Sequence, residues 1–256
     1  MPTGTWSGSA LAREVLEARA DVIVAVAHSA IRAALNATTT VPIIIWGNFD
    51  PVAAGYVKSL ARPGGNVTGV LIAPEGTLAA KKLQLLKEVV PRTRRIAVLG
   101  PQDPSSMKTQ LPELRKAASA LGVELVIVET RNGDYERAFA TIAAERPGAL
   151  FVVATTYFVR DRRPIIELAA KYRLPAMWEW REQVEDGGLM AYGSSLAQRL
   201  ERIATYVDRL FKGENPGDLP VDQPTKFELV INMNTAKALG VAIPQSLLLR
   251  ADELIQ

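Results

Sequence analysis

The stretch VPIIIWGNFDPVAAGYVKSLARPGGNVTG, residues Val41–Gly69, decides the fold of this chain. It opens with Pro42–Trp46, an apolar run of strand length that is rich in β-branched residues. Asp50 is a natural N-cap, and Pro51 suits the first position of a helix, where a missing N–H is tolerated. The stretch therefore predicts a helix over Val52–Leu60 after the strand.

The same stretch closes with a second strand. Residues 61–66, ARPGGN, form a turn signal, and Val67–Ile72 resumes an apolar run. Neither GxxxxGK[ST] nor GxGxxG occurs, so the glycine pair is interpreted as a turn rather than a phosphate loop. Strand, loop, helix and strand in this order form a parallel βαβ unit, whose ligands bind beyond the carboxyl ends of the strands. Trp46 to Asp50 are therefore expected at the mouth of a binding site.

Strands alternate with helices along the rest of the chain, which predicts an α/β class with parallel sheets. The predicted strands are Asp21–Val26, Pro42–Trp46, Val67–Ile72, Arg95–Leu99, Val123–Val128, Ala149–Val153, Leu174–Trp178 and FELVI at 227–231. The predicted helices are Ala10–Ala20, Ala30–Ala37, Val52–Leu60, Leu78–Val90, Met107–Leu121, Tyr135–Glu145, Arg160–Tyr172 and Leu196–Phe211, followed by two short ones.

So many strands indicate two sheets, each with helices on both faces, rather than one. We expect two doubly wound lobes, with crossings near Pro74, Gly193 and Val221. The first lobe would hold residues 1–74 and 191–256, and the second would hold residues 75–190.

Composition excludes several classes of site. Hydrophobic residues make up 48% of the 256 residues and charged residues 22%, as in an ordinary globular chain. The net charge of +3 is too small, and the basic residues too dispersed, to indicate nucleic-acid binding. Cysteine is absent and histidine occurs once, which excludes disulfides, thiolate catalysis and two-histidine metal sites. No metal and no cofactor is expected.

The first predicted lobe offers two polar candidates at strand ends. His28 and Ser29 lie between a strand and a helix, so their N–H groups and the Ser29 hydroxyl could bind an anion. AHSAI lacks both glycines of a GxSxG elbow, so a catalytic His28–Ser29 pair is not indicated. Asp50 is either an N-cap or a carboxylate that binds a ligand's ammonium group. Both roles are compatible only if one of its oxygens is spare.

In the second predicted lobe, three loops lie at equivalent strand ends: Gln102–Ser106, Thr155–Tyr157 and Trp178–Arg181. Trp178 and Glu179 could form an aromatic wall with an ion-pairing group above it, or simply a strand end with a core tryptophan. The charged residues of the helices Lys81–Glu88 and Arg199–Arg209 are interpreted as solvated faces. The candidate ligand-binding residues are His28, Ser29, Trp46, Phe49, Asp50, Gln102, Ser105, Thr155, Thr156, Tyr157, Trp178, Glu179 and Tyr192.

Three separated blocks resemble one protein family. They are DPVAAGYVKSLARPGGNVTG (50–69), LPAMWEWREQVEDGGLMAYG (174–193) and LPVDQPTKFELVINMNTAKALGVAIPQSLLLRADELI (219–255). They are similar to ABC-transporter substrate-binding proteins of the tryptophan/tyrosine-uptake type. The resemblance implies a two-lobed fold like that of type I periplasmic binding proteins. It also implies an amino-acid-like or carboxylate ligand in the interlobe cleft, hinge closure, a membrane permease as partner and no catalysis. A hydroxyl residue at Ser29 and a site-lining Asp50 fit the same pattern.

The resemblance also sets an expectation for the start of the chain. Residues 1–9 are polar and show no signal peptide, whereas members of the family begin with a signal or lipoprotein segment and further strands. We expect a first lobe that lacks its N-terminal strands, with a sheet that is either rearranged or paired with another chain through its unpaired edge. The location would be periplasmic or membrane-anchored extracellular, or cytoplasmic if the chain is complete as given.

Two other functions stay open on the sequence alone. One is a doubly wound enzyme that uses Asp50 and Glu179 on a small polar metabolite. The other is a ligand-sensing regulatory domain, which needs a helix-turn-helix segment, and none precedes Ala10.

Overall fold

The computed structural model describes residues 8–73, 78–101, 104–131 and 133–256. The chain divides into two compact units. Unit 1 comprises Met1–Ile72 and Ala197–Pro224, and unit 2 comprises Ala73–Leu196 and Thr225–Gln256. The chain therefore passes between the units three times. The first expected crossing, at Pro74, lies outside the described residues. The other two crossings were expected near Gly193 and Val221, and each lies about three residues further along the chain.

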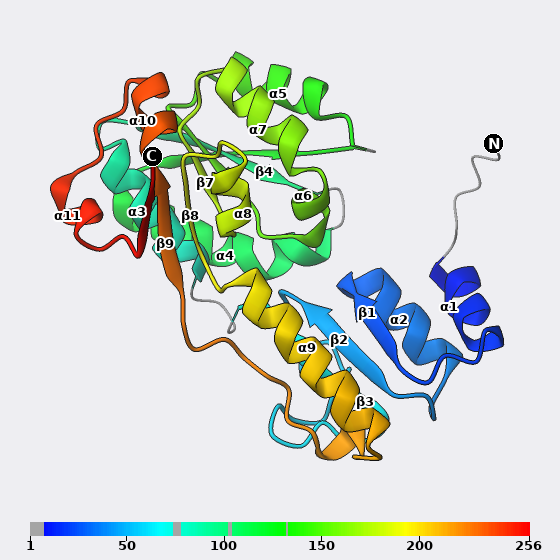
Figure 1. Ribbon diagram of the computed structural model, residues 1–256. Helices are drawn as coiled ribbons and strands as arrows, with labels where there is room; N and C mark the ends of the chain where they lie inside the picture. The colour runs from blue at the N-terminus through cyan, green and yellow to red at the C-terminus, as the bar shows by residue number, and fades with distance from the viewer. Residues whose placement is uncertain (1–7, 74–77, 102–103, 132) are drawn as a thin grey trace. The chain divides into compact units, whose positions relative to one another are not determined.

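Unit 1 is a small parallel sheet with a helix on each face (Figure 1). Its described elements are α1 (Gly8–Glu17), β1 (Ile23–Val26), α2 (Ala27–Ala37), β2 (Ile43–Gly47), β3 (Val67–Leu71), α9 (Leu196–Phe211) and the 3₁₀ turn η1 (Pro216–Asp218). The strand order is β1-β2-β3. Ile43 and Ile45 pack on the side of α2, while Ile44 packs on the side of α9. This alternation is the period of two that a strand imposes.

The predicted helix over Val52–Leu60 is wrong. Residues 51–55 form a single turn. Asp50 caps it as expected, because its Oδ1 accepts hydrogen bonds from the N–H groups of Val52 at 2.8 Å and Ala53 at 3.0 Å. Gly55 then adopts φ +72°, a left-handed conformation that ends a helix. The connection between β2 and β3 is therefore built of turns, although the two strands are parallel as predicted.

Replacing Gly55 tests this turn. Because Gly55 has a left-handed conformation that is unfavourable for alanine, Gly55→Ala should lower the free energy of unfolding by about 1–2 kcal/mol. Urea denaturation measures this change. Gly55→Asn, which tolerates the same conformation, should be close to neutral. A helix at this position would give the opposite sign, because alanine stabilises a helix interior by about 0.5–1 kcal/mol relative to glycine.

Unit 2 is built on a larger sheet with strand order β10-β9-β8-β7-β6-β4-β5. Its described strands are β4 (Arg95–Gly100), β5 (Glu124–Glu129), β6 (Ala149–Val152), β7 (Ala176–Trp178), β8 (Met190–Gly193), β9 (Glu228–Asn232) and β10 (Glu253–Ile255). Its described helices are α3 (Leu78–Val89), α4 (Pro104–Leu121), α5 (Tyr135–Ala144), α6 (Thr156–Arg160), α7 (Arg162–Lys171), α8 (Arg181–Glu185), α10 (Met233–Leu239) and α11 (Gln245–Leu248). The single predicted helix Arg160–Tyr172 is thus two, α6 and α7, which meet at Asp161.

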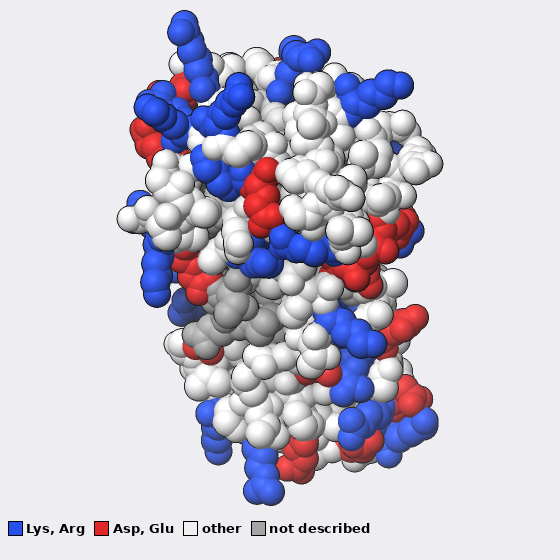
Figure 2. Space-filling model, turned by 90° about the vertical axis from the view of Figure 1, so that its left-hand side faces the viewer, with Lys and Arg blue, Asp and Glu red and all other residues white. Residues whose placement is uncertain are grey.

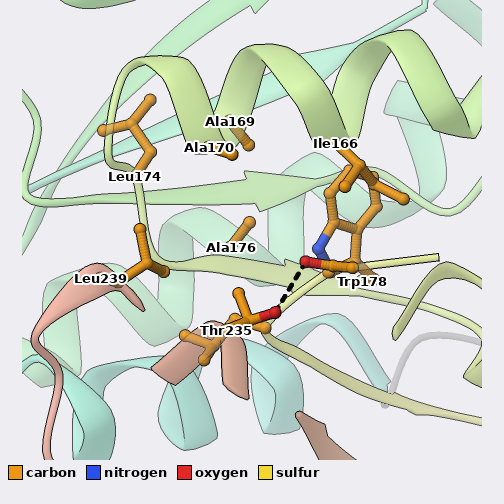
Figure 3. A pocket seen from close by; sticks show the side chains of 11 residues that line it. Ile166, Ala169, Ala170, Leu174, Ala176, Trp178, Thr235 and Leu239 are labelled. Carbon is orange, nitrogen blue, oxygen red and sulfur yellow. Dashed lines mark hydrogen bonds between the residues drawn. The ribbon is translucent and has the colours of Figure 1, made fainter. Parts of the chain in front are cut away.

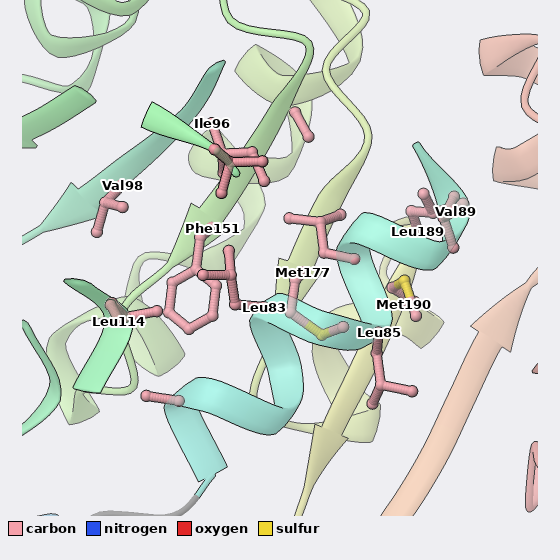
Figure 4. Close-up of a cluster of buried hydrophobic side chains, with 14 of the residues drawn as sticks. Leu83, Leu85, Val89, Ile96, Val98, Leu114, Phe151, Met177, Leu189 and Met190 are labelled. Atoms are coloured by element: carbon pink, nitrogen blue, oxygen red, sulfur yellow. The ribbon is translucent and has the colours of Figure 1, made fainter. Parts of the chain in front are cut away.

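Helices cover both faces of this sheet. On one face, α3 and α4 pack on Ile96, Val98, Phe151 and Met177, and Figure 4 shows Leu83 of α3 beside these side chains. On the other face, α5 and α7 pack on the residues that alternate with them, such as Ala97 and Leu99. Two fully covered faces define a doubly wound sheet, which confirms the predicted fold class.

The C-terminal segment lies in unit 2, whereas we expected residues 191–256 in the first lobe. The strand β9 pairs antiparallel with β8, and β10 pairs parallel with β9. Leu229 and Ile231 enter the core on one face and Val230 the core on the other. Since a strand that is apolar on both faces needs two covered faces, β9 completes the larger sheet. Only Ala197–Pro224 belongs to unit 1.

The composition of the described helices and of one face of the molecule can be compared with that of membrane spans and of surfaces with a single charge. No helix among the described residues combines the length and the apolar composition of a membrane span. On the face drawn in Figure 2, Lys and Arg side chains are interspersed with Asp and Glu.

Candidate functional site

In unit 1, three rings gather at the carboxyl ends of β1 and β2. Nδ1 of His28 lies 2.5 Å from the Tyr56 hydroxyl, a short hydrogen bond. The ring of Phe49 lies 4.9 Å from that of His28 and 5.7 Å from that of Tyr56, the latter edge to face. Gly47 allows this arrangement, since a Cβ there would overlap the Phe49 ring. His28, Phe49 and Tyr56 therefore form one aromatic cluster.

Two polar groups flank the aromatic cluster along the chain. Ser29 lies in the first turn of α2 and its side chain is exposed. Asp50 follows Phe49 and uses only Oδ1 in its cap, so Oδ2 accepts no hydrogen bond within the described part of the chain. One oxygen of Asp50 is therefore spare, as its two roles of N-cap and ligand-binding carboxylate together require.

The start of α2 differs from the prediction. Ala27 to Ser29 were expected as a turn before a helix at Ala30, but they are the first residues of α2. Ala27 has φ +66°, an uncommon conformation for a residue with a Cβ. It turns the chain sharply, so that the helix begins directly at the end of β1. Ser29 consequently sits in the N-terminal turn, where free N–H groups favour anions.

Trp46 does not join the aromatic cluster. It packs on the opposite face of the sheet, with Ile44, Val207 and Val22 beneath α9. Its Nε1 is buried and finds no hydrogen-bond partner in the part of the chain that the structure describes. Because neighbouring strand residues point to opposite faces, Trp46 and the residues of the aromatic cluster cannot line one wall.

In unit 2, the carboxyl end of β6 is held by a side chain that the sequence analysis did not single out. Gln110 of α4 donates to the carbonyl of Ala154 at 2.9 Å and accepts from its N–H at 3.1 Å. Thr155 follows as the buried N-cap residue of α6, and Thr156 and Tyr157 are half-buried in its first turn. Gln110 thus fixes the loop that carries three of the predicted residues.

A polar pair flanks α6. The Tyr135 hydroxyl donates to Oδ2 of Asp161 at 2.5 Å. Burial, together with this hydrogen bond, raises the pKa of Tyr135 well above its usual range. A hydrogen bond from the exposed Arg160 lowers the pKa of Asp161. Asp161 is therefore a carboxylate already engaged by its neighbours.

Trp178 is not a wall of an open site, which corrects the aromatic-wall interpretation. Its side chain is fully buried in the core between the sheet and α7, and Trp180 is buried as well. Trp178 lines a small pocket of about 20 Å³. Figure 3 shows it there with Ile166, Ala169 and Thr235. In a sheet covered on both faces, a tryptophan on a strand has no solvent side to occupy.

Glu179 forms the most deeply buried ion pair of the described chain. Nζ of Lys82 donates to Glu179 Oε2, and the two side chains are 1% and 2% exposed. Nζ also lies 5.2 Å from the centre of the Phe151 ring. Lys82 was predicted on a solvated helix face and is instead inside unit 2. Glu179 Oε1 has no hydrogen-bond partner among the described residues.

The remaining candidates are distributed as follows. Tyr192 lies in β8 with its ring 6.1 Å from Phe227, and burial raises its pKa. Gln102 lies outside the described residues, and Ser105 falls in the first turn of α4. Among the described residues, no group of three or more His, Asp or Glu could hold a metal ion.

Removing one partner of the buried pair should be costly. We expect Lys82→Met to lower the free energy of unfolding by about 3–5 kcal/mol, because it leaves the Glu179 carboxylate buried and unpaired. The double variant Lys82→Met/Glu179→Leu should recover most of that loss, since an apolar pair of similar volume needs no charge compensation. Equal stability of Lys82→Met and the parent in urea denaturation would show that the pair is not buried.

Several known proteins are similar to this chain. The family model described as ABC transporter substrate binding protein matches residues 7–255. A curated relative, the "Tyrosine-binding protein" of Clostridioides difficile (strain R20291), is 27% identical over 232 residues. That alignment covers 90% of this chain and 66% of the relative, so the chain spans just under two thirds of the relative's length.

Two solved structures are similar over almost the whole chain. A conserved domain protein from Vibrio cholerae superposes with a TM-score of 0.86 at 28% identity, covering 96% of this chain and 82% of that one. The ABC domain from Streptococcus pneumonia in complex with L-Trp superposes with a TM-score of 0.83 at 25% identity, covering 97% and 83%.

Proposed function

The chain belongs to the family of ABC transporter substrate binding proteins, and from this premise we propose that it binds a small α-amino acid. The contacts would come from the carboxyl edge of the unit 1 sheet. The observation that carries the proposal is Asp50, which follows Phe49 of the aromatic cluster and whose Oδ2 accepts no hydrogen bond from the described residues. The relatives that bind tyrosine and L-Trp support an aromatic amino acid.

The proposed contacts follow from the chemistry of each group. Asp50 Oδ2 would accept from the ligand's ammonium, and Ser29 with the first N–H groups of α2 would donate to its carboxylate. The apolar body would lie against Phe49, because an aromatic face buries area at little entropic cost. Trp46 and Trp178, which we first considered for this role, are not part of the proposal.

Calorimetric titration with L-tryptophan and L-tyrosine tests these contacts. Asp50→Asn and Ser29→Ala should each weaken binding by about 1–3 kcal/mol, the range for losing a hydrogen bond to a charged group. Asn retains the oxygen that caps the turn, so Asp50→Asn should leave the stability of the free protein nearly unchanged. If both variants bind like the parent, the assignment of these residues is wrong.

We propose that the bound amino acid is delivered unchanged to the membrane permease of an ABC importer, at the periplasmic or extracellular side of the membrane. Stimulation of the permease's ATP hydrolysis by the loaded protein, and not by Asp50→Asn, would support this partner. The alternative is a doubly wound enzyme, and it would be favoured by any chemical change in the amino acid after incubation with the protein.

Self-association through the outer edge of β1 is a further proposal. In the described part of the chain β1 pairs only with β2, and Val24 in its middle is 42% exposed. Since an unpaired strand edge pairs readily with another, light scattering should detect a concentration-dependent dimer. Val24→Lys should abolish it, whereas Leu200→Lys, at another exposed apolar residue of unit 1, should not. A parent protein that stays monomeric at all concentrations would refute the proposal.

A further inference from the structure

A small pocket of unit 2 combines apolar walls with a buried N–H group. Trp178 lines this pocket, and its Nε1 is buried and donates to no acceptor within the described residues. We propose that the pocket binds one water molecule, which accepts a hydrogen bond from Trp178 Nε1 and donates one to Thr235 Oγ1. The water links β7 to α10, and its site shares no residue with the amino-acid site proposed for unit 1.

The pocket lies on the α7 side of the sheet, toward the amino ends of β7 and β8. Its walls come from α7, from Leu174 and Ala176 at the start of β7, from the turn at residues 187–189 and from α10. Figure 3 shows the nitrogen edge of the Trp178 indole on the side of the ring that faces Thr235. Elements that are distant in the sequence therefore meet around one small space.

The volume of the pocket limits the size of its ligand. The pocket measures about 20 Å³. A water molecule needs roughly 10–15 Å³ of such space, so a second water does not fit, and neither does an amino acid. The proposed ligand is therefore a single water molecule.

Polar groups decide whether a pocket of this size is wet or dry. A purely apolar cavity stays dry, whereas a buried water is held by hydrogen bonds to several polar groups. Here Trp178 supplies a donor. Thr235 Oγ1 donates to the carbonyl oxygen of Gly187 at 3.0 Å, so the hydroxyl keeps lone pairs and the carbonyl keeps one. All three residues line the pocket, and together they offer a water one donor and two acceptors.

The indole N–H gains most from such a partner. Trp178 is 0% exposed, so its N–H has lost the hydrogen bond that bulk water would provide. A side chain at Gly188 could not replace that bond, because a Cβ there would lie 2.7 Å from Nε1 and 2.7 Å from the carbonyl oxygen of Gln183. A bridging water restores the hydrogen bond with little loss of entropy.

The water site has a structural consequence for the C-terminal segment. α10 belongs to Thr225–Gln256, the segment that returns to unit 2 after the chain has passed through unit 1. Within the described chain, no hydrogen bond joins Trp178 to Thr235 directly. The shared water therefore adds a polar link between this returning segment and the central strand β7.

A crystal structure of the protein, at a resolution that shows ordered water, tests the site itself. We expect one water molecule at about 2.7–3.2 Å from Trp178 Nε1, with Thr235 Oγ1 as a second partner at a similar distance. A pocket without electron density would overturn the inference, and so would a pocket that holds a larger molecule.

Urea denaturation tests the link in solution. Thr235→Val keeps the shape of the side chain but removes the hydroxyl, so it should lower the urea midpoint of the parent. In a Trp178→Phe background the water has lost its donor, and the same substitution should shift the midpoint only about half as far. Thr235→Ser, which retains the hydroxyl, is the matched control and should cause equal shifts in both backgrounds. Equal shifts for Thr235→Val would show that the two side chains share no partner and would overturn the inference.

Discussion

The parallel pairing of β4, β6, β7 and β8 is the constraint on which the account depends. Parallel strands in one sheet must end at the same edge, so residues far apart in sequence come together there without any specific contact between them. Gln110 then fixes the end of β6, and Lys82 fixes the residue after β7. The pairing of β1, β2 and β3 does the same on a smaller scale, and it places His28 of α2 beside Phe49 after β2.

Buried charge at such an edge is poor evidence for stability. An ion pair taken out of water regains at best what its desolvation costs, and an apolar pair of equal volume is often as stable. The pair of Lys82 and Glu179 is therefore expected to add little stability beyond what an apolar pair would give. The same holds for Asp50, since a serine or an asparagine would cap the turn equally well but would leave no charged oxygen.

Much of the fold could be predicted because apolar runs such as Pro42–Trp46 and their alternation with amphipathic helices are local signals. Three failures each have a physical cause. The turn at Gly55 depends on one residue's φ, which the capping signals at Asp50 and Pro51 do not report. Trp178 could not be assigned to core or site, because the strands of a sheet covered on both faces are apolar throughout and show no alternation of polar and apolar residues. Lys82 looked like a surface lysine because its partner lies 97 residues away.

Native mass spectrometry of the protein, refolded free of ligand and then offered an equimolar mixture of amino acids, sugars and simple carboxylic acids, tests the central claim most directly. Asp50 Oδ2 accepts no hydrogen bond from the described residues, which predicts that the protein retains one molecule that carries an ammonium group. The account therefore predicts a one-to-one complex with an α-amino acid, tryptophan or tyrosine foremost. Retention of a sugar or of a carboxylic acid without an amino group, or of no molecule at all, would contradict it.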